Sequence, residues 1–202
     1  ALTLVIIAGS ELFTGHTMFL TLGVKAGTIS HGQMWAILPQ TWLGNLVGSV
    51  FVALLYSWGG GSLLPVDTSI VQSVALAKTT APATVLFFKG ALCNWLVCLA
   101  IWMAIRTEGA AKFLAIWWCL LAFIASGYEH SVANMTLFAL SWFGHHSEAY
   151  TLSGIGHNLL WVTLGNTLSG VVFMGLGYWY ATPKSERPAP AKINQPEAAA
   201  NN

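Results

Sequence analysis

The chain has 202 residues, of which 55% are hydrophobic and 7% are charged, and its net charge is +1. A soluble domain carries about 25% charged residues, so this composition excludes an ordinary soluble surface and predicts that lipid surrounds most of the protein. So small a net charge also excludes a general electrostatic attraction to nucleic acid. Three cysteines, Cys93, Cys98 and Cys119, lie in apolar stretches and are expected to be buried thiols that act as small hydrophobic residues.

The first apolar stretch, residues 1–24, is interrupted by Gly9, Ser10 and Glu11. It begins at Ala1 in the middle of an apolar run without a charged leader, and we expect that a natural N-terminal segment precedes it. Glycine beside an ionisable residue within an apolar run is typical of a discontinuous membrane helix. The stretch therefore predicts a broken helix rather than a plain span.

Four further apolar stretches follow along the chain. A spanning helix needs about 20 mostly apolar residues, and residues 34–58, 84–105 and 158–181 each meet this requirement. Residues 113–143 are too many for one span and contain Gly127, Tyr128, Glu129 and His130, which predict a second broken helix.

Charges in the connections predict the orientation of these segments. The basic residues Lys25, Arg106 and Lys112 lie in alternate connections, 25–33 and 106–112, and the tail adds Lys184, Arg187 and Lys192. The other connections, 59–83 and 143–157, contain Lys78 together with Asp67 and Glu148. The basic bias places the first set in the cytoplasm. We take residues 1–181 as one transmembrane domain and 182–202, rich in proline and alanine, as a disordered cytoplasmic tail.

The two broken helices belong to an internal repeat. Glu11 stands 34 residues before Asn45, and Glu129 stands 37 residues before Asn166; each asparagine lies in a Leu-Gly-Asn sequence on a whole helix. The two copies run in opposite directions, an arrangement that transporters and channels build around a site at mid-membrane. We expect an all-α membrane protein made of an inverted repeat of three helices, with the first helix of the first copy missing before Ala1.

Small residues on two whole spans predict close packing inside the protomer. They are Gly44, Gly48 and Ser49 on the first, and Gly165, Ser169 and Gly170 on the last.

Four ionisable residues at membrane depth each cost about 2.5–3.5 kcal/mol on insertion scales. His130 is either a pore-lining proton donor or a neutral ring bonded to a carbonyl freed by the break. Glu11 and Glu129 are expected to support the breaks by accepting backbone N–H groups, although a cation-binding role is the alternative. Lys89 either attracts anions in an outer vestibule or extends toward the membrane surface.

Histidines also permit a different class of protein, a redox anchor subunit that binds haem between His130 and His157. His145 and His146 lie in a short loop and indicate no site. A neutral-solute pore of aquaporin type is disfavoured because the chain has no Asn-Pro-Ala sequence. No enzyme activity, cofactor or metal is predicted.

The two breaks, AGSELFTGH (8–16) and SGYEHSVANM (126–135), resemble the signatures of the formate/nitrite transporter family. KGALCNWLVC (89–98) and LGNTLSG (164–170) resemble two more of its recurrent segments, and the likeness extends from Ala1 to about Ala181. This resemblance implies a homopentamer of six-helix protomers with an aquaporin-like fold, one pore in each protomer, in the bacterial inner membrane.

The resemblance also implies roles for individual residues. His130 resembles the central pore histidine and Thr14 the threonine that faces it. The residues that resemble the apolar constrictions are Leu2, Leu12, Phe13 and Phe123. Asn94 and Asn134 resemble polar pore residues, and Lys89 resembles the vestibule lysine. The cargo implied is a small monovalent anion, with nitrite favoured by overall likeness and formate, hydrosulfide or nitrate left open.

Overall fold

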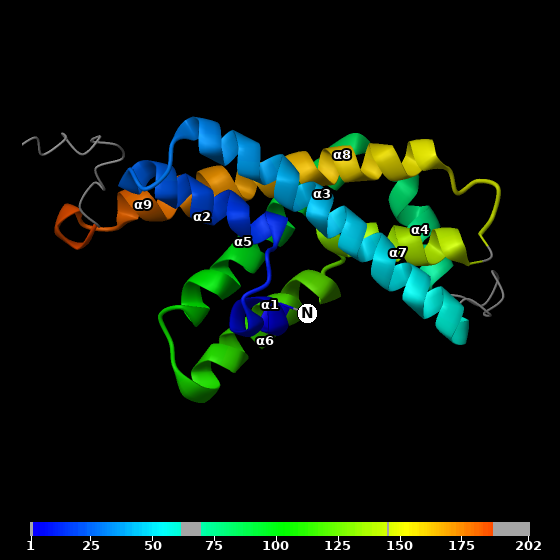
Figure 1. Cartoon of the computed structure of the whole chain (residues 1–202), viewed down its shortest axis with the longest axis horizontal. Helices are drawn as coiled ribbons and strands as arrows, with labels where there is room; N and C mark the ends of the chain where they lie inside the picture. Colours follow the sequence, from blue (N-terminus) through cyan, green and yellow to red (C-terminus); the bar gives the residue numbers. More distant parts are fainter. Residues whose placement is uncertain (1, 62–69, 145, 188–202) are drawn as a thin grey trace, which may run out of the picture.

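The computed structural model describes residues 2–61, 70–144 and 146–187, and these residues form helices and no strand (Figure 1). The first half of the described chain contains α1 (Leu2–Ala8), α2 (Phe13–Ala26), α3 (His31–Tyr56) with its π-helical end η1 (Ser57–Gly61), and α4 (Ile70–Thr79). The second half contains α5 (Ala83–Ala104), α6 (Gly109–Ala125), α7 (Ser131–Phe143), α8 (Leu152–Leu168), η3 (Ser169–Leu176), α9 (Gly177–Ala181) and η4 (Lys184–Glu186).

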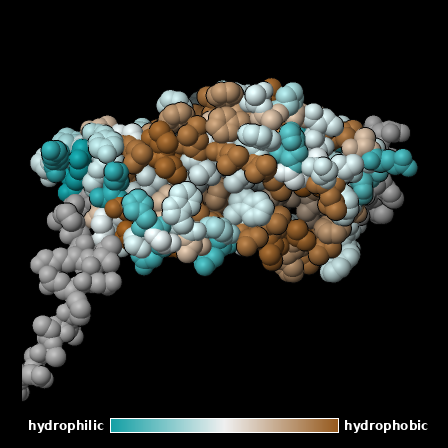
Figure 2. Space-filling model, turned by 90° about the horizontal axis from the view of Figure 1, so that it is seen from above, coloured by the Kyte–Doolittle hydropathy of each residue, from teal (hydrophilic) through white to brown (hydrophobic). Residues whose placement is uncertain are grey.

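In the described part of the chain, three helices are long and apolar enough to cross a membrane: His31–Gly61, Ala83–Ala104 and Leu152–Ala181. They confirm the three whole spans predicted from the sequence. The last begins earlier than predicted because Thr151 caps it, its side chain accepting the backbone N–H of Gly154. In Figure 2, hydrophobic residues cover much of the middle of the molecule, and hydrophilic ones gather mainly toward its two ends.

Both predicted breaks are present and have the same construction. Shortly after the first helix of each pair comes a glycine in the left-handed region, Gly9 with φ 74° and Gly127 with φ 62°, a conformation that costs glycine little. The chain then runs extended and re-enters a helix at Phe13 or at Ser131. Across the first break α1 and α2 are bent by 47°.

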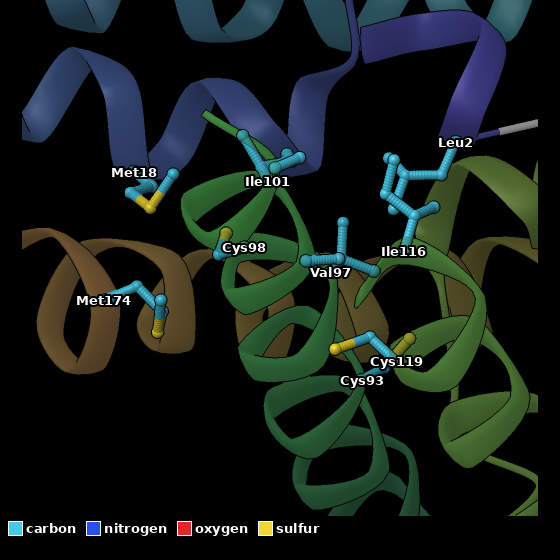
Figure 3. Close-up of a cluster of buried hydrophobic side chains, with 11 residues drawn as sticks. Leu2, Met18, Cys93, Val97, Cys98, Ile101, Ile116, Cys119 and Met174 are labelled. Atoms are coloured by element: carbon cyan, nitrogen blue, oxygen red, sulfur yellow. The ribbon is translucent and has the colours of Figure 1, made fainter. Parts of the chain in front are cut away.

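The two halves of the repeat pack into each other. The whole helix of the first half, α3, lies against α7 of the second, and η3, which continues the whole helix of the second half, lies against α2 of the first. At the centre, α5 packs against α2, α6, α8 and η3. Figure 3 shows the apolar cluster around α5, which includes Cys93, Cys98 and Cys119 as buried, free thiols. The expectation for the cysteines is therefore confirmed.

Basic residues near the ends of α2, α5 and α9 lie on one side of the molecule, as the alternation of loop charges predicted, and the cytoplasmic location of that side stays a prediction. The Lys25 ammonium donates a hydrogen bond to the Tyr180 hydroxyl at 3.2 Å, and Arg106 and Arg187 line one hollow, so α2, α5 and α9 end on the same side. The helix α4, which carries Lys78, lies at the opposite end of the molecule (Figure 1). Asp67, His145 and Lys192 lie outside the described residues. Of the predicted tail, residues 182–187 are described and contain the turn η4.

The small-residue prediction is right for one span and wrong for part of the other. A Cβ atom on Gly165 would lie 2.1 Å from the Phe87 carbonyl oxygen of α5, so α8 and α5 are in backbone contact there. On α3, Ser49 is buried, but no described atom lies within 4 Å of a Cβ built on Gly44 or Gly48. The glycine face of α8 is covered by α5, whereas no described helix covers the glycine face of α3.

This close approach can be tested by adding a methyl group. Gly165→Ala should lower the thermal unfolding midpoint of the detergent-solubilised protein, because overpacking a tight contact costs about 1–3 kcal/mol. Gly156→Ala is the matched control on the same helix, where a Cβ has no described atom within 4 Å, and should leave the midpoint unchanged or raise it. Equal midpoints for the two variants would contradict backbone contact between α5 and α8.

Candidate functional site

A small cavity lies where the two breaks meet, with His130 as its most polar side chain. Its volume is about 190 Å³, and its other lining residues are Leu2, Val5, Leu12, Val97, Leu120, Phe123, Val132, Ala133 and Thr136. The Phe123 ring stacks on the His130 ring, with the ring centres 6.2 Å apart and the planes at 24°. Three of the four residues predicted to form constrictions therefore line one cavity with the predicted pore histidine.

Two helix N-termini point to this cavity. Leu12 is the N-cap of α2 and His130 is the N-cap of α7, and both line the cavity. The Thr14 hydroxyl, in the first turn of α2, lies 3.0 Å from His130 Nε2. Each helix N-terminus carries a partial positive charge, so the site favours an anion.

The hydrogen bonds of His130 indicate which of its nitrogens carries the proton. The Ala133 backbone N–H donates to Nδ1 at 3.0 Å, and a nitrogen that accepts a hydrogen bond holds no proton. The proton of the neutral ring therefore sits on Nε2 and is donated to the Thr14 hydroxyl oxygen. The sequence left two alternatives for His130, a pore-lining proton donor or a neutral ring bonded to a carbonyl. Neither describes the arrangement fully, because the ring accepts a helix N–H as an N-cap and also offers an N–H donor beside the cavity. Proton transfer from His130 stays a prediction.

Two asparagines from the repeat bond the backbone of the two breaks with their side-chain amides. Asn45 on α3 accepts the Phe13 N–H at 2.9 Å and donates to the Glu11 carbonyl at 2.9 Å. Asn166 on α8 accepts the Ser131 N–H at 2.9 Å and donates to the Glu129 carbonyl at 3.0 Å. Each side-chain amide thus bonds the backbone of its break at the same two relative positions. The spacing of Leu-Gly-Asn revealed the repeat but not this role.

Asn94 joins the two halves from α5. Its side-chain amide donates to the Asn166 carbonyl at 2.7 Å, to the Thr14 carbonyl at 3.2 Å and to the Thr17 hydroxyl at 3.1 Å. The residue is fully buried and does not line the His130 cavity. The structure therefore shows Asn94 positioning the first turn of α2, which carries Thr14, and the predicted contact of Asn94 with the cargo remains untested.

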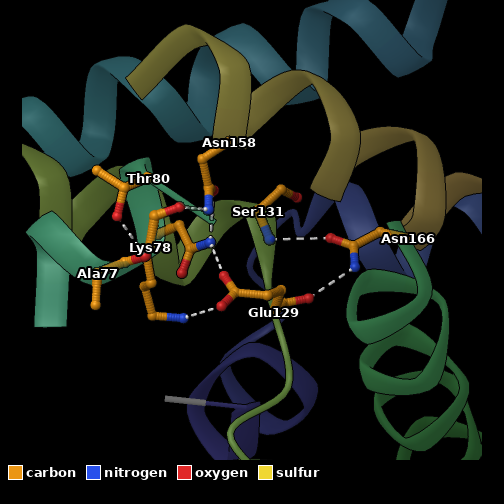
Figure 4. A network of polar contacts seen from close by, with 8 residues as sticks. Ala77, Lys78, Thr80, Glu129, Ser131, Asn158 and Asn166 are labelled. Atoms are coloured by element: carbon orange, nitrogen blue, oxygen red, sulfur yellow. Dashed lines mark hydrogen bonds and ion pairs between the residues drawn. The ribbon is translucent and has the colours of Figure 1, made fainter. Parts of the chain in front are cut away.

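The second break contains a buried ion pair that sequence reasoning missed (Figure 4). The Glu129 carboxylate lies 2.7 Å from Lys78 Nζ, with the side chains 5% and 19% exposed. Its other oxygen accepts from the Asn134 amide at 2.6 Å, and that amide also donates to Asn158 at 2.9 Å. Asn158 in turn donates to the Lys78 carbonyl at 2.9 Å. The network neutralises and fully bonds a charge that would otherwise be costly to bury.

The sequence indicates Lys78 only as a loop charge, because residues 59–83 show no pattern that predicts the helix α4. The sequence contains one signal that could have identified this role of Lys78. Only 7% of the residues are charged, so a lysine between apolar stretches is expected to pair with a carboxylate. The predicted pore residue Asn134 is 2% exposed and lies in this network. Its contact with the cargo stays a prediction.

The first break carries a different pair. The Glu11 carboxylate contacts His16 Nε2, and His16 Nδ1 lies 3.0 Å from the Thr41 hydroxyl of α3. The sequence suggested that both glutamates accept backbone N–H groups, but the structure gives each a side-chain partner, while Asn45 and Asn166 bond the backbone.

Lys89 and Phe13 lie away from the cavity. Lys89 is partly buried on α5, and its carbonyl accepts the Glu129 N–H at 3.3 Å. Phe13 is buried among Met34 and Leu38 of α3, so its ring packs between helices. The vestibule role of Lys89 and the constriction role of Phe13 remain predictions.

The histidines of the haem hypothesis bond to different elements. His130 contacts Thr14, whereas His157 Nε2 lies 3.2 Å from the Ala81 carbonyl. These contacts already hold a nitrogen of each ring, and no observation favours a shared haem.

Broken helices whose N-termini meet at a cavity between spanning helices define a membrane transport protein. The sequence model of the formate/nitrite transporter family matches residues 1–180, and the chain belongs to this family. The nitrite transporter NirC of Salmonella typhimurium is 98% identical over 202 residues, which are 100% of this chain and 75% of that protein.

Two solved structures resemble the fold. A chain described as an FNT family ion channel superposes with a TM-score of 0.88 at 98% identity, covering 90% of this chain and 73% of that one. A pentameric formate channel with formate bound superposes with a TM-score of 0.74 at 28% identity, covering 88% of this chain and 77% of that one. These likenesses agree with the all-α inverted-repeat fold described above.

The ion pair at the second break generates a stability prediction. Lys78→Met leaves the Glu129 carboxylate buried without a cation and should cost about 3–5 kcal/mol, seen as a lower unfolding midpoint and less folded protein. Adding Glu129→Gln removes the stranded charge and should restore most of the loss. Lys184→Met, at an exposed position, is the control. A double variant as unstable as Lys78→Met would show that the charge pair is not the cause.

Proposed function

We propose that the protein passes nitrite, a small monovalent anion, through the His130 cavity of each protomer across the bacterial inner membrane. The observation that carries this proposal is the cavity itself, where two helix N-termini and a histidine N–H meet between apolar walls. The name of the relative that is 98% identical, a nitrite transporter, supports nitrite as the cargo. The role in the cell that follows is nitrite movement during nitrate assimilation.

The chemistry of the cavity supports a step in which the anion is partly neutralised. Apolar side chains such as Leu2, Leu12 and Phe123 replace the hydration shell of the ion, which is expensive for a bare charge. The two helix N-termini offset part of this cost. His130 offers Nε2–H, and a nearby anion stabilises the ring once it has taken up a second proton from water at the mouth of the path. The ring can pass one proton to the anion, which then crosses as the neutral acid, and the ring returns to its neutral form.

This proton transfer has a structural consequence at the cap of α7. A doubly protonated ring carries hydrogen on Nδ1 and cannot accept the Ala133 N–H, so the 3.0 Å bond seen here would open during each protonation. The neutral ring is then the resting state, restored when the proton leaves. Transport of this kind is passive or coupled to protons.

The surroundings proposed for the channel follow from its surface. Large apolar side chains are exposed on α3 and α6, among them Val47, Phe51, Trp117 and Trp118, and neighbouring protomers of a homopentamer or lipid would cover them. The described pentameric formate channel of the same fold supports this assembly. The basic ends of α2, α5 and α9 support a cytoplasmic C-terminus.

Flux measurements test the cargo. The protein reconstituted in proteoliposomes should pass nitrite faster than nitrate, formate or hydrosulfide at equal concentration and pH. The formate bound in the relative of 28% identity makes formate the main rival. Formate flux above nitrite flux would overturn nitrite as the cargo, and no anion flux at all would overturn the channel.

Replacing His130 separates chemistry from capping. His130→Asn keeps a favourable N-cap residue but removes the proton donor, so nitrite flux should fall and lose most of its dependence on pH between about pH 5 and pH 8. Flux is measured across that range at equal protein abundance, with His157→Asn as the control. An unchanged pH profile for His130→Asn would leave the histidine a purely structural residue.

Replacing Thr14 tests the hydroxyl that His130 contacts. Thr14→Val preserves shape but removes a hydrogen bond worth about 1 kcal/mol, so nitrite flux should slow by about threefold to tenfold while the assembly stays intact. Thr167→Val on α8, whose hydroxyl bonds only within its own helix in the described contacts, is the matched control. Parental flux in Thr14→Val would show that the hydroxyl serves the fold alone.

A further inference from the structure

A second hollow lies at the end of the molecule where α2, α5 and α9 finish. It shares no described lining residue with the His130 cavity. Its volume is about 330 Å³, and its lining residues include Leu22, Ala26, Trp102, Arg106, Trp179 and Arg187. Three membrane-crossing elements end around it, which places it at the boundary between apolar core and water. We call it the arginine hollow, after Arg106 and Arg187.

The two guanidinium groups of the hollow are held in place by aromatic rings. The guanidinium carbon of Arg106 lies 3.6 Å from the centre of the Trp102 ring, and that of Arg187 lies 5.3 Å from the centre of the Trp179 ring. Arg187 also donates to the Thr182 carbonyl at 3.0 Å and to the Tyr180 carbonyl at 3.3 Å. The ring contacts orient both guanidinium groups, and the two carbonyl contacts orient that of Arg187 further. A guanidinium group has five N–H donors, so the described contacts leave donors of each arginine available to a ligand.

Neither arginine has a carboxylate partner in the described part of the chain. The ion pairs found there are Glu11 with His16 and Lys78 with Glu129. Glu186 lines the hollow but forms no ion pair with either guanidinium among the described residues. Two oriented guanidinium groups that form no ion pair with a described carboxylate, that of Glu186 included, are complementary to an anion with several oxygens.

The walls of the hollow indicate where that anion comes from. Leu22 and Ala26 give one apolar side, and the indole rings of Trp102 and Trp179 give an amphipathic one. A free anion gains nothing from apolar walls, whereas a lipid glycerol and the start of its acyl chains would bury against them. Basic pockets between membrane helices on the cytoplasmic side are typical sites for acidic lipid headgroups.

We propose that the arginine hollow binds the phosphodiester headgroup of an anionic phospholipid, with Arg106 and Arg187 as its phosphate ligands. The site is separate from the proposed anion path and does not depend on the cargo. Loop charge alone would spread basic residues over this end of the protein, whereas here two of them converge on one hollow with aromatic support.

Native mass spectrometry of the detergent-solubilised protein with added phosphatidylglycerol or phosphatidylcholine tests the proposal. The parent should retain phosphatidylglycerol in preference to phosphatidylcholine, and Arg106→Gln with Arg187→Gln should weaken retention of phosphatidylglycerol at least tenfold. Lys112→Gln with Lys184→Gln removes the same charge from the same end without touching the hollow and should change retention less than twofold. Equal losses for the two pairs would overturn the site, because a general field would then explain binding.

Two further measurements guard against a variant that merely folds poorly and against a free anion as occupant. Glu186→Gln removes the negative side chain found among the described lining residues and should strengthen retention of phosphatidylglycerol. Misfolding cannot produce such a gain, and unchanged or weaker retention would count against the hollow as the binding site. Inorganic phosphate at millimolar concentration should not displace the lipid. Displacement by phosphate would overturn the lipid assignment and leave a site for free oxyanions.

Discussion

A spanning helix that breaks at mid-membrane frees carbonyl and N–H groups that lipid cannot bond, and this constraint shapes the rest of the protein. Asn45 and Asn166 meet it in the same way, each by bonding the carbonyl of the glutamate and the amide two residues further on. Asn94 then connects the backbone of Asn166 to the first turn of α2, which carries Thr14. Protein groups thereby bond one carbonyl and one N–H at each break, and neither Asn45 nor Asn166 lines the cavity.

Charge around the cavity is balanced so that an anion meets no net repulsion. An unpaired Glu129 beside His130 would oppose any anion near the second break, but Lys78 cancels its charge. What remains near the cavity is the partial positive charge of two helix N-termini and the neutral His130 donor. The ion pair therefore neutralises a buried carboxylate next to His130, although neither of its members lines the cavity.

The sequence predicted the elements better than their contacts. Runs of apolar residues locate the three whole spans, and glycine beside glutamate locates both breaks, because these signals are local and strong. The partner of Glu129 could not be read in this way, since Lys78 lies 51 residues away on α4, a short helix within a stretch that looks like a loop. The same limit applies to Phe13: sequence places it beside Leu12, but only the fold shows one side chain in the cavity and the other packed on α3. For Gly44 and Gly165 the local pattern is shared, and the neighbouring helix alone decides which of them is covered.

The two asparagine clamps differ in their surroundings, and this difference sets an order of local opening. Asn166 is fully buried and also donates to the Gly90 carbonyl of α5 at 2.7 Å, whereas Asn45 is only partly buried and makes no hydrogen bond beyond its own break among the described contacts. Local unfolding requires less free energy where fewer buried contacts must be lost. The amide hydrogen of Phe13 therefore exchanges with solvent through a less costly fluctuation than that of Ser131. Of the two breaks, the one held by Asn45 is accordingly expected to open at a lower cost in free energy than the one held by Asn166.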